Sequence, residues 1–486
     1  MAQPPKRHGS DLTTGPIGRT LLAFALPTLA SNILQTLNGS INSIWVGRFL
    51  GESALAATSN ATIVMFLTFG AVFGFGMAAS ILIGQSIGRH DIEAARRAFG
   101  SAVGLVVGSA ILISALGYIY APEILHLMAT PGDAQAMALV YLRVIFLGLP
   151  LSMFALLVQM GLRGAGDALT PMWFMVVSAI IDAGLNPLLI RGIGPFPEMG
   201  IAGSATATLV AAAVSAVGLV VYSYVRDLPI RLRGAELAYL IPDPALIRII
   251  VAKGVPMAAQ MLVMSVSGLT MIGLVNRLGV ETAAAYAVSQ QLWNYIQMPA
   301  MAIGAAVSSM AAQNIGAGLW DRVNRITRSG IVYNTVITLV VIAAIILFDR
   351  PVMGLFIDGG SPAIPIARHI QLIASWTFLL FGATMVLFAT VRANGATLAP
   401  LLILVVSLIP IRIGIALLGR RLLGADALWW AYPLSSIVSL SLAAIYFRYG
   451  SWRTQVLAVP PTTHPNAAEE STLASSEPAG RLHPTS

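Results

Sequence analysis

The feature that most constrains this chain is an internal repeat, because many residues recur about 229 positions later in the second half. The recurring pairs include Pro27 with Pro256, Gly39 with Gly268, Val46 with Val275, Arg48 with Arg277 and Glu52 with Glu281. A longer motif also recurs, since Arg163-x-x-Gly166-x-x-Leu169-x-Pro171 matches Arg392-x-x-Gly395-x-x-Leu398-x-Pro400. The repeat predicts two similar lobes, an arrangement that is typical of alternating-access transporters when the chain lies in a membrane.

The composition indicates that both lobes lie in a membrane. Hydrophobic residues make up 57% of the chain and charged residues 10%, against about 45–50% and about 25% in soluble proteins. Apolar runs long enough to cross a hydrocarbon core of about 30 Å recur along the whole length. Their approximate spans are 20–47, 54–86, 95–121, 135–161, 170–190, 201–225, 245–275, 283–314, 323–348, 365–391, 399–419 and 426–448. The sequence therefore predicts an all-α polytopic membrane protein with twelve transmembrane helices in two six-helix lobes.

The loops predict the orientation of the chain. Because each half has an even number of spans, both halves begin on the same side and the repeat is parallel. Basic residues are concentrated in the loops on the side of both termini, which identifies that side as cytoplasmic. This bias explains the net charge of +8, so no nucleic-acid partner is expected. We expect a monomer in the plasma (bacterial inner) membrane, with the lipid bilayer and small-molecule substrates as its partners.

The predicted domain organisation follows from these spans and from the polar segments between them. It comprises a cytoplasmic tail at 1–19, an N-terminal lobe at 20–226, a cytoplasmic linker at 227–244, a C-terminal lobe at 245–449 and a disordered cytoplasmic tail at 450–486.

Motifs for enzymatic chemistry are absent from the sequence. The chain has no cysteine, and its six histidines lie in loops, at helix ends or in tails. Its glycines do not form a phosphate-binding loop followed by Lys-Ser or Lys-Thr. We therefore expect no enzyme activity, no cofactor and no metal centre. Transport would then be powered by an ion gradient.

One acidic residue, Asp182, lies well inside a predicted span. An Asp near the centre of a transmembrane helix costs roughly 2.5–3.5 kcal/mol on insertion scales, so such residues are functional by default. Ser178, Asp182 and Asn186 fall on one face of this helix, and the first predicted helix carries a second polar stripe. That stripe consists of Gln35, Asn38 and Asn42, and Thr206 and Thr208 at the start of the sixth span supply more oxygen atoms. The alternative is that these side chains only form interhelical hydrogen bonds.

The second half has no equivalent acid, because the position that corresponds to Asp182 is Ile411. Its eighth span instead carries Tyr286, Gln290, Asn294 and Gln297 at helical spacing, and its seventh carries Met257, Met261 and Met264. Thioether side chains adapt to irregular apolar ligands, although Met is also common packing material in membrane cores. The only basic residues well inside spans are Arg143, Lys253 and Arg412, which are expected to snorkel to the helix ends.

Several motifs together resemble the multidrug and toxic compound extrusion (MATE) family over about residues 17–450. They are Val46-Gly47-Arg48, Gly84-Gln85-x-x-Gly88, Arg163-Gly164-x-Gly166-Asp167-x-x-x-Pro171 and Gly200-x-x-Gly203-x-x-x-Ala207-Thr208. The resemblance implies twelve helices in two lobes, a V-shaped cavity, and efflux of cationic or lipophilic compounds against H⁺ or Na⁺.

The sequence departs from the family pattern at its polar residues. Family members commonly carry Asp in the first helix where this chain has Asn42, and Asn-x-x-x-Asp-Pro where it reads Asp182-x-x-x-Asn186-Pro187. Some members carry an acid in the seventh helix for Na⁺, where this chain has Met264. One carboxylate thus remains where the family often has two.

These observations predict an antiporter that exports cationic or lipophilic compounds, most simply against H⁺, with Asp182 as the coupling carboxylate. The predicted ion-coupling residues are Asp182, Asn186, Asn42, Asn38 and Thr206, and oxygen ligation of Na⁺ at Asp182, Asn186 and Asn42 stays open. The predicted substrate-binding residues are Gln35, Asn38, Asn42, Gln159, Asp182, Met261, Met264, Gln290 and Asn294. The alternatives are a lipid-linked glycan flippase, which would need several cationic residues in its cavity, and a membrane receptor or scaffold that does not transport.

Overall fold

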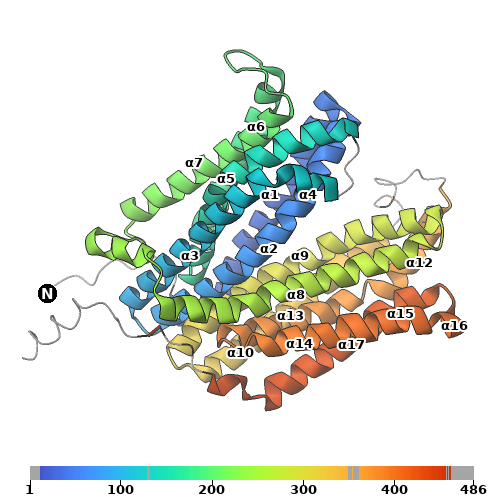
Figure 1. Cartoon of the computed structure of the whole chain (residues 1–486). Coiled ribbons are helices and arrows are strands. Elements are labelled where there is room, and N and C mark those ends of the chain that lie inside the picture. Colours follow the sequence, from blue (N-terminus) through green and yellow to red (C-terminus); the bar gives the residue numbers. More distant parts are fainter. Residues whose placement is uncertain are drawn as a thin grey trace, which may run out of the picture.

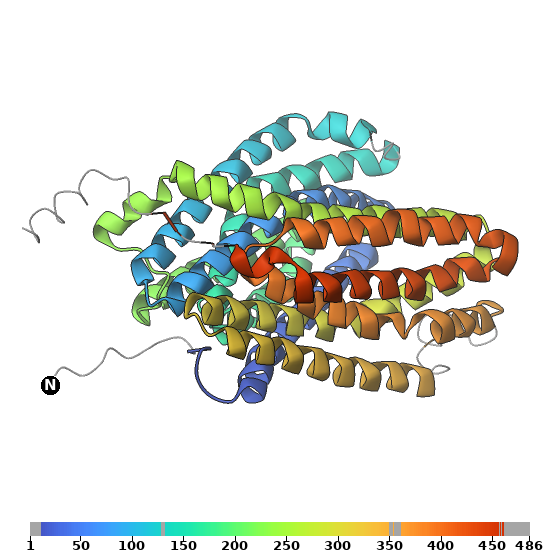
Figure 2. The ribbon, with the colours of Figure 1, turned by 90° about the horizontal axis from the view of Figure 1, so that it is seen from below.

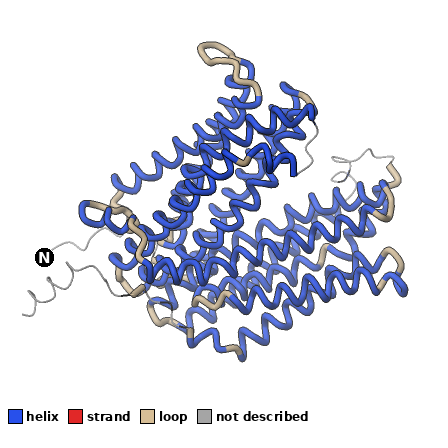
Figure 3. Tube along the Cα trace, viewed as in Figure 1, coloured by secondary structure: helices blue, strands red, loops and turns tan. Residues whose placement is uncertain are grey.

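Long helices form two bundles in the computed structural model, which describes residues 11–127, 132–348, 353, 361–455, 457 and 459–460 (Figure 1). Within these residues every regular element is a helix, loops and turns join the helices, and no strand is present (Figure 3). The N-terminal lobe consists of α1 (Ile17–Leu50), α2 (Glu52–Gly88), α3 (Ile92–Ile119), α4 (Ala121–Leu127), α5 (Gly132–Gly164), α6 (Leu169–Arg191) and α7 (Ile201–Val225). The segment after this lobe contains a short 3-10 helix, η1 (Gly234–Leu240).

The C-terminal lobe repeats this arrangement with more interruptions. It consists of α8 (Pro244–Asn276), α9 (Val280–Gly316), α10 (Trp320–Leu347), α12 (Ala363–Ala374), α13 (Thr377–Ala393), α14 (Leu398–Val406), η2 (Ser407–Ile413), α15 (Gly414–Leu418), α16 (Arg420–Leu423) and α17 (Asp426–Tyr449). The segment η2 is a turn of π-helix that contains Pro410, whereas the corresponding helix of the first lobe, α6, is a continuous α-helix. Seen from below, the C-terminal lobe lies in front of the N-terminal lobe (Figure 2).

All twelve predicted spans coincide with helices, but two of them are not single, continuously apolar helices. Among the described residues, ten helices are long and apolar enough to cross a membrane, or eleven if the bent pair α12 and α13 forms one span. The helix α9 is as long as α2 but does not pass this test, because polar side chains interrupt its apolar sequence. Those side chains are Gln290, Gln291, Asn294 and Gln297, and they line cavities rather than face lipid.

The recurring Arg-x-x-Gly motif forms the same turn in both lobes. Gly166 and Gly395 follow the ends of α5 and α13 with φ angles of 92° and 85°. This left-handed region is costly for residues that carry a Cβ atom, which explains why glycine occupies both positions.

The two lobes meet through a symmetric set of contacts near the C-terminal ends of α2 and α9. Gln85 Nε2 donates a hydrogen bond to the Ala393 carbonyl at 2.7 Å, and its counterpart Gln313 Nε2 donates to the Gly164 carbonyl at 3.2 Å. A Cβ atom added to Gly88 would collide with the Gln313 carbonyl, and one added to Gly316 would collide with the Gln85 carbonyl. We call the contact formed by Gln85, Gly88, Gln313 and Gly316 the gate contact.

Part of the segment predicted to be a disordered tail packs against both lobes. Residues Ser451–Thr454 form a 3-10 helix, and the Trp452 side chain is fully buried. The Leu457 carbonyl accepts a hydrogen bond from Arg89 at 2.7 Å, so the segment joins the second lobe to α2. The prediction of disorder was therefore wrong for residues 451–455. It was based on the polar composition of the segment, whereas the buried side chain of Trp452 fixes the segment to the lobe. The remainder of the tail, 461–486, lies outside the described residues.

Candidate functional site

The carboxylate of Asp182 lies between three helices of the first lobe and is 1% exposed. It accepts hydrogen bonds from Asn38 Nδ2 on α1 at 2.7 Å, from Thr208 Oγ1 on α7 at 3.2 Å and from Asn186 Nδ2 on α6 at 3.3 Å. All three donors are neutral, and among the described residues no basic side chain pairs with Asp182. The site therefore stabilises a buried carboxylate by hydrogen bonds alone.

A second layer of hydrogen bonds connects this carboxylate to Asn42. The Asn42 Oδ1 atom accepts from Asn186 Nδ2 at 3.2 Å and from Ser204 Oγ at 2.6 Å. We define the carboxylate site by its six hydrogen-bonded residues, which are Asp182, Asn38, Asn42, Asn186, Ser204 and Thr208.

The sequence predicted Asp182, Asn38, Asn42 and Asn186 for this site, and the structure brings all four together. Of the two threonines, Thr208 contacts Asp182, whereas Thr206 takes no part in the hydrogen bonds of the site. The reason is helical spacing, because Ser204 and Thr208 share one face of α7 and Thr206 lies roughly half a turn away. Ser204 is a further site residue that its i, i+4 relation to Thr208 could have indicated.

Two oxygen atoms beside the carboxylate lack a partner. The Asn38 Oδ1 and Asn186 Oδ1 atoms are buried and accept no hydrogen bond within the described part of the chain. Unpaired buried acceptors are costly unless a proton donor or a cation occupies them. The carboxylate site therefore holds two free acceptors, which a proton or a cation could use.

A cleft of about 720 Å³ lies between α1 of the first lobe and α9 of the second. Gln35 and Ser43 line it from α1, and Asn294, Gln297 and Met301 line it from α9. The lobes diverge from the gate contact towards the end where α4 and α12 lie (Figure 1). Two predicted substrate residues from different lobes, Gln35 and Asn294, thus meet in one cleft, and α1 separates this cleft from Asp182.

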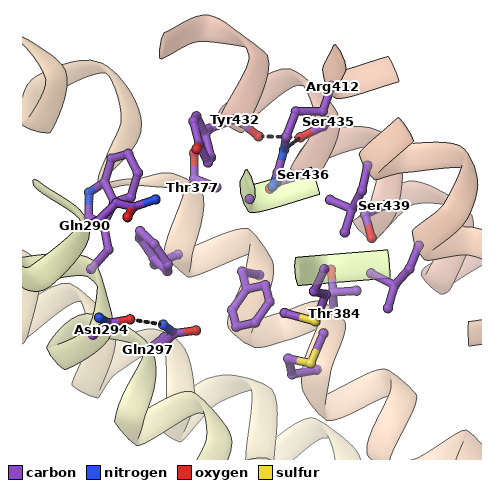
Figure 4. Close-up of a pocket in the computed structure, with 18 residues that line it drawn as sticks. Gln290, Asn294, Gln297, Thr377, Thr384, Arg412, Tyr432, Ser435, Ser436 and Ser439 are labelled. Atoms are coloured by element: carbon purple, nitrogen blue, oxygen red, sulfur yellow. Dashed lines mark hydrogen bonds between the residues drawn. The ribbon is translucent and has the colours of Figure 1, made fainter. Parts of the chain in front are cut away.

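A second cavity of about 240 Å³ lies inside the C-terminal lobe (Figure 4). Three predicted substrate residues, Met264, Gln290 and Asn294, line it. The guanidinium of Arg412 also lines this cavity and donates from Nε to Ser435 Oγ at 2.9 Å, so the prediction that Arg412 snorkels to the helix end was wrong. The helix changes to a π-turn here, which reorients the side chains that follow it.

Two predicted substrate residues lie apart from these sites. Met261 on α8 lines neither the cleft nor the C-lobe cavity. Gln159 is buried on α5 and also lines neither of them. Sequence periodicity places such residues on a helix face without indicating whether that face meets a cavity or a neighbouring helix.

Two membrane-embedded lobes, a polar cleft between them and a buried carboxylate beside that cleft define an integral membrane transporter. The family model MatE matches residues 27–188 and 256–418, one match in each half, and the chain belongs to this family. The starts of the two matches are the repeated residues Pro27 and Pro256, which confirms the internal duplication.

Individual relatives cover nearly the whole chain. The probable multidrug resistance protein YoeA of Bacillus subtilis is 33% identical over 435 residues, which is 89% of this chain and 94% of that protein. The probable multidrug resistance protein YpnP of the same organism is 28% identical, over 92% of this chain and 98% of that protein. A solved outward-facing structure of a multidrug resistance MATE family transporter superposes with a TM-score of 0.83 at 21% identity, over 92% of this chain and 98% of that one. This similarity confirms the fold.

Proposed function

We propose that this protein is a secondary antiporter that exports cationic or lipophilic compounds in exchange for protons. The observation that carries the proposal is the buried carboxylate of Asp182, which neutral donors hold behind α1, the helix that forms one wall of the interlobe cleft. The names of the relatives, probable multidrug resistance proteins, support the substrate class. The concentration of basic residues in one set of loops supports a plasma-membrane protein with both termini in the cytoplasm.

Protonation would change the hydrogen bonding of the carboxylate site in a defined way. The ionised carboxylate only accepts hydrogen bonds, whereas a protonated one must donate through one of its oxygens. The unpaired Oδ1 atoms of Asn38 and Asn186 lie on residues that already contact Asp182, so either side chain can turn to accept this proton. Because Asn38 belongs to α1, the rearrangement would be transmitted to the helix that forms one wall of the cleft.

Exchange then follows from competition for one negative charge. A cationic compound in the cleft is attracted by the charge of ionised Asp182 across α1, and a proton taken from outside removes that attraction. The proton is released to the cytoplasm after the lobes change their orientation. One proton exchanged for one monovalent cation is electroneutral, so one pH unit supports about a tenfold cation gradient. A single carboxylate is therefore energetically sufficient for export.

Sodium is the second candidate for the coupling ion, and one specific observation favours it. The unpaired oxygens of Asn38 and Asn186, together with the Asp182 carboxylate, are hard ligands of the kind that alkali and alkaline-earth cations prefer. The proton remains the first choice because each oxygen of the carboxylate already accepts a hydrogen bond, which leaves fewer lone pairs for a metal ion.

Purified protein in liposomes separates these alternatives. Ethidium, a permanently charged aromatic cation, would be added outside vesicles that have either an acid interior without Na⁺ or a Na⁺-loaded interior without a pH difference. We expect accumulation only in the acid-loaded vesicles, and none in protein-free vesicles under the same gradient. Accumulation driven by Na⁺ alone would show that the coupling ion is sodium and not the proton. If neither gradient drives ethidium, the proposal of cation export fails.

A further inference from the structure

We propose that the cavity inside the C-terminal lobe binds the carboxylate of an aromatic organic acid through Arg412. The cavity would then select a substrate class that the carboxylate site in the first lobe repels. Use of this site in export rests on the proposed transport function, whereas binding itself does not.

The first argument is that the charge of Arg412 is uncompensated. Its Nε–H donates to Ser435 Oγ, and its guanidinium carbon lies 4.6 Å from the centre of the Tyr432 ring. Among the described residues, its two terminal amino groups have no hydrogen-bond partner, and no Asp or Glu lines the cavity. A cation in the low dielectric of a membrane protein is costly unless it is paired. An incoming anion would supply the missing partner.

The second argument is that the position of the guanidinium is built into the lobe. Ser435 accepts from Arg412 while its own hydroxyl donates to the Tyr432 carbonyl at 2.9 Å, so its orientation is set. The Tyr432 hydroxyl is in turn hydrogen-bonded to Tyr286 on α9. These contacts hold Arg412 over the cavity, where its planar guanidinium can present two parallel N–H donors to a carboxylate (Figure 4).

The other walls specify what the anion is attached to. Trp293, Phe378 and Phe381 line the cavity, and flat side chains of this kind stack on aromatic rings. Thr377 also lines it, and its buried Oγ1 has no hydrogen-bond partner in the described part of the chain, so it is available to a ligand (Figure 4). A volume of about 240 Å³ lies below the roughly 300–1,000 Å³ of sites for drug-sized ligands. The fit is therefore to an acid with one or two rings.

The cavity is reached from the interlobe cleft. Asn294 and Gln297 line both spaces, and Gln297 Nε2 donates to Asn294 Oδ1 at 3.0 Å. This amide pair therefore lies where the cavity and the cleft adjoin, and Figure 4 shows it at the edge of the cavity. Access through a polar cleft favours a water-soluble acid over the headgroup of a membrane lipid, which would have to leave the bilayer.

Equilibrium dialysis of radiolabelled 2-naphthoate against the full-length protein in a neutral detergent tests this proposal. Neutral 2-naphthamide serves as the competitor that keeps the rings and removes the charge. We expect 2-naphthoate to bind at low ionic strength and 2-naphthamide to compete at least about tenfold more weakly, since hydrogen bonds to charged groups are the stronger ones. Equal competition by the amide would overturn the role of Arg412.

Three variants locate the site. Arg412→Met should weaken 2-naphthoate binding by about tenfold or more, because it keeps an unbranched apolar stem and removes the guanidinium. Gly268→Leu should block binding by filling the cavity, since Gly268 lines it and an added Cβ would meet no atom within 4 Å. Asp182→Asn should bind 2-naphthoate as tightly as the parent, even if it no longer transports cations.

The outcomes separate this proposal from the proposed function. Unchanged binding in a folded Arg412→Met or Gly268→Leu protein would contradict the site, whatever the transport assays show. If Arg412→Met does not fold, the Gly268→Leu variant and the competition by 2-naphthamide still show whether the acid binds in this cavity through its charge. A third outcome is that the protein binds 2-naphthoate only weakly and that phosphatidylglycerol displaces it. That result would identify a lipid headgroup as the ligand and overturn the aromatic-acid assignment.

Discussion

The two lobes descend from one repeated sequence, yet their interiors carry opposite charges. In the first lobe, α6 carries Asp182, which neutral donors on α1, α6 and α7 hold. In the second lobe, the corresponding helix carries Ile411 at the equivalent position, followed by Arg412, whose guanidinium reaches Ser435 on α17. The same scaffold therefore holds a buried acid in one half and a half-buried base in the other.

The residues that are the same in both lobes include those that form the contact between the lobes. Gln85 and Gln313 make equivalent hydrogen bonds across the interface, and Gly88 and Gly316 permit the same close approach. The contrast indicates that the gate contact depends on both copies, whereas each interior was free to acquire its own ligand chemistry. The following experiments test this division, from the largest expected effect to the smallest.

Asp182→Asn should reduce proton-driven ethidium accumulation to the level of protein-free vesicles, because it removes the only buried carboxylate of the described transmembrane helices. Glu52→Gln is a matched control, since Glu52 is an exposed carboxylate at the start of α2 and should leave transport unchanged. Retained accumulation in Asp182→Asn would place coupling outside the first lobe.

Gly88→Ala and Gly316→Ala should each loosen the gate contact, because the added Cβ collides with a backbone carbonyl of the opposite lobe. Overpacking typically costs about 1–3 kcal/mol, a shift of roughly fivefold or more in a two-state equilibrium. The chain has no cysteine, so Ser86→Cys provides a single buried reporter on α2. Its maleimide labelling should become at least about fivefold faster in both glycine variants.

Gly39→Ala and Gly268→Ala are the controls for the gate experiment. They form another repeated pair, and an added Cβ at either position meets no atom within 4 Å. Their labelling rates should match the parent. Faster labelling for only one of Gly88→Ala and Gly316→Ala would show that the two lobes do not contribute equally to the contact.

Asn38→Ala should impair proton-driven transport more than Asn42→Ala. Asn38 donates directly to the carboxylate at 2.7 Å, whereas Asn42 acts through Asn186 and Ser204. Loss of a hydrogen bond to a charged group costs about 1.5–3 kcal/mol and loss of a neutral one about 0.5–1.5 kcal/mol. The apparent proton affinity, measured from the pH dependence of initial ethidium uptake, should change more in Asn38→Ala than in Asn42→Ala. A larger change in Asn42→Ala would contradict the description of the site as two layers of hydrogen bonds.

Glu52→Gln and Glu281→Gln should have the smallest effects, and these effects should be equal. Both residues lie in the first turn of a long helix, α2 or α9, where a negative charge interacts favourably with the helix dipole. Each change should lower the melting temperature of the detergent-solubilised protein by about 1–2 °C. A much larger loss for one of them would reveal a role for that residue beyond the helix end.

The sequence predicted the helices and most of the carboxylate site because both depend on periodicity. Apolar runs mark the spans, and Asp182 with Asn186 lies at the i, i+4 spacing of one helix face. The choice between Thr206 and Thr208 needed the rotation of α7, which packing sets. The C-lobe cavity was not predicted because the π-turn at Ser407–Ile413 changes the direction of Arg412, and periodicity assumes an uninterrupted α-helix. The polar face of α9 was recognised, but only the structure shows that it borders two cavities.

The central claim, that a proton and a cationic substrate compete for Asp182, is tested most directly by proton release on binding. Ethidium would be added to the detergent-solubilised protein in weakly buffered solution while the pH is recorded. The account predicts that the parent protein releases protons as ethidium binds and that Asp182→Asn binds without release. Equal release from both proteins, or binding to the parent without any release, would contradict it.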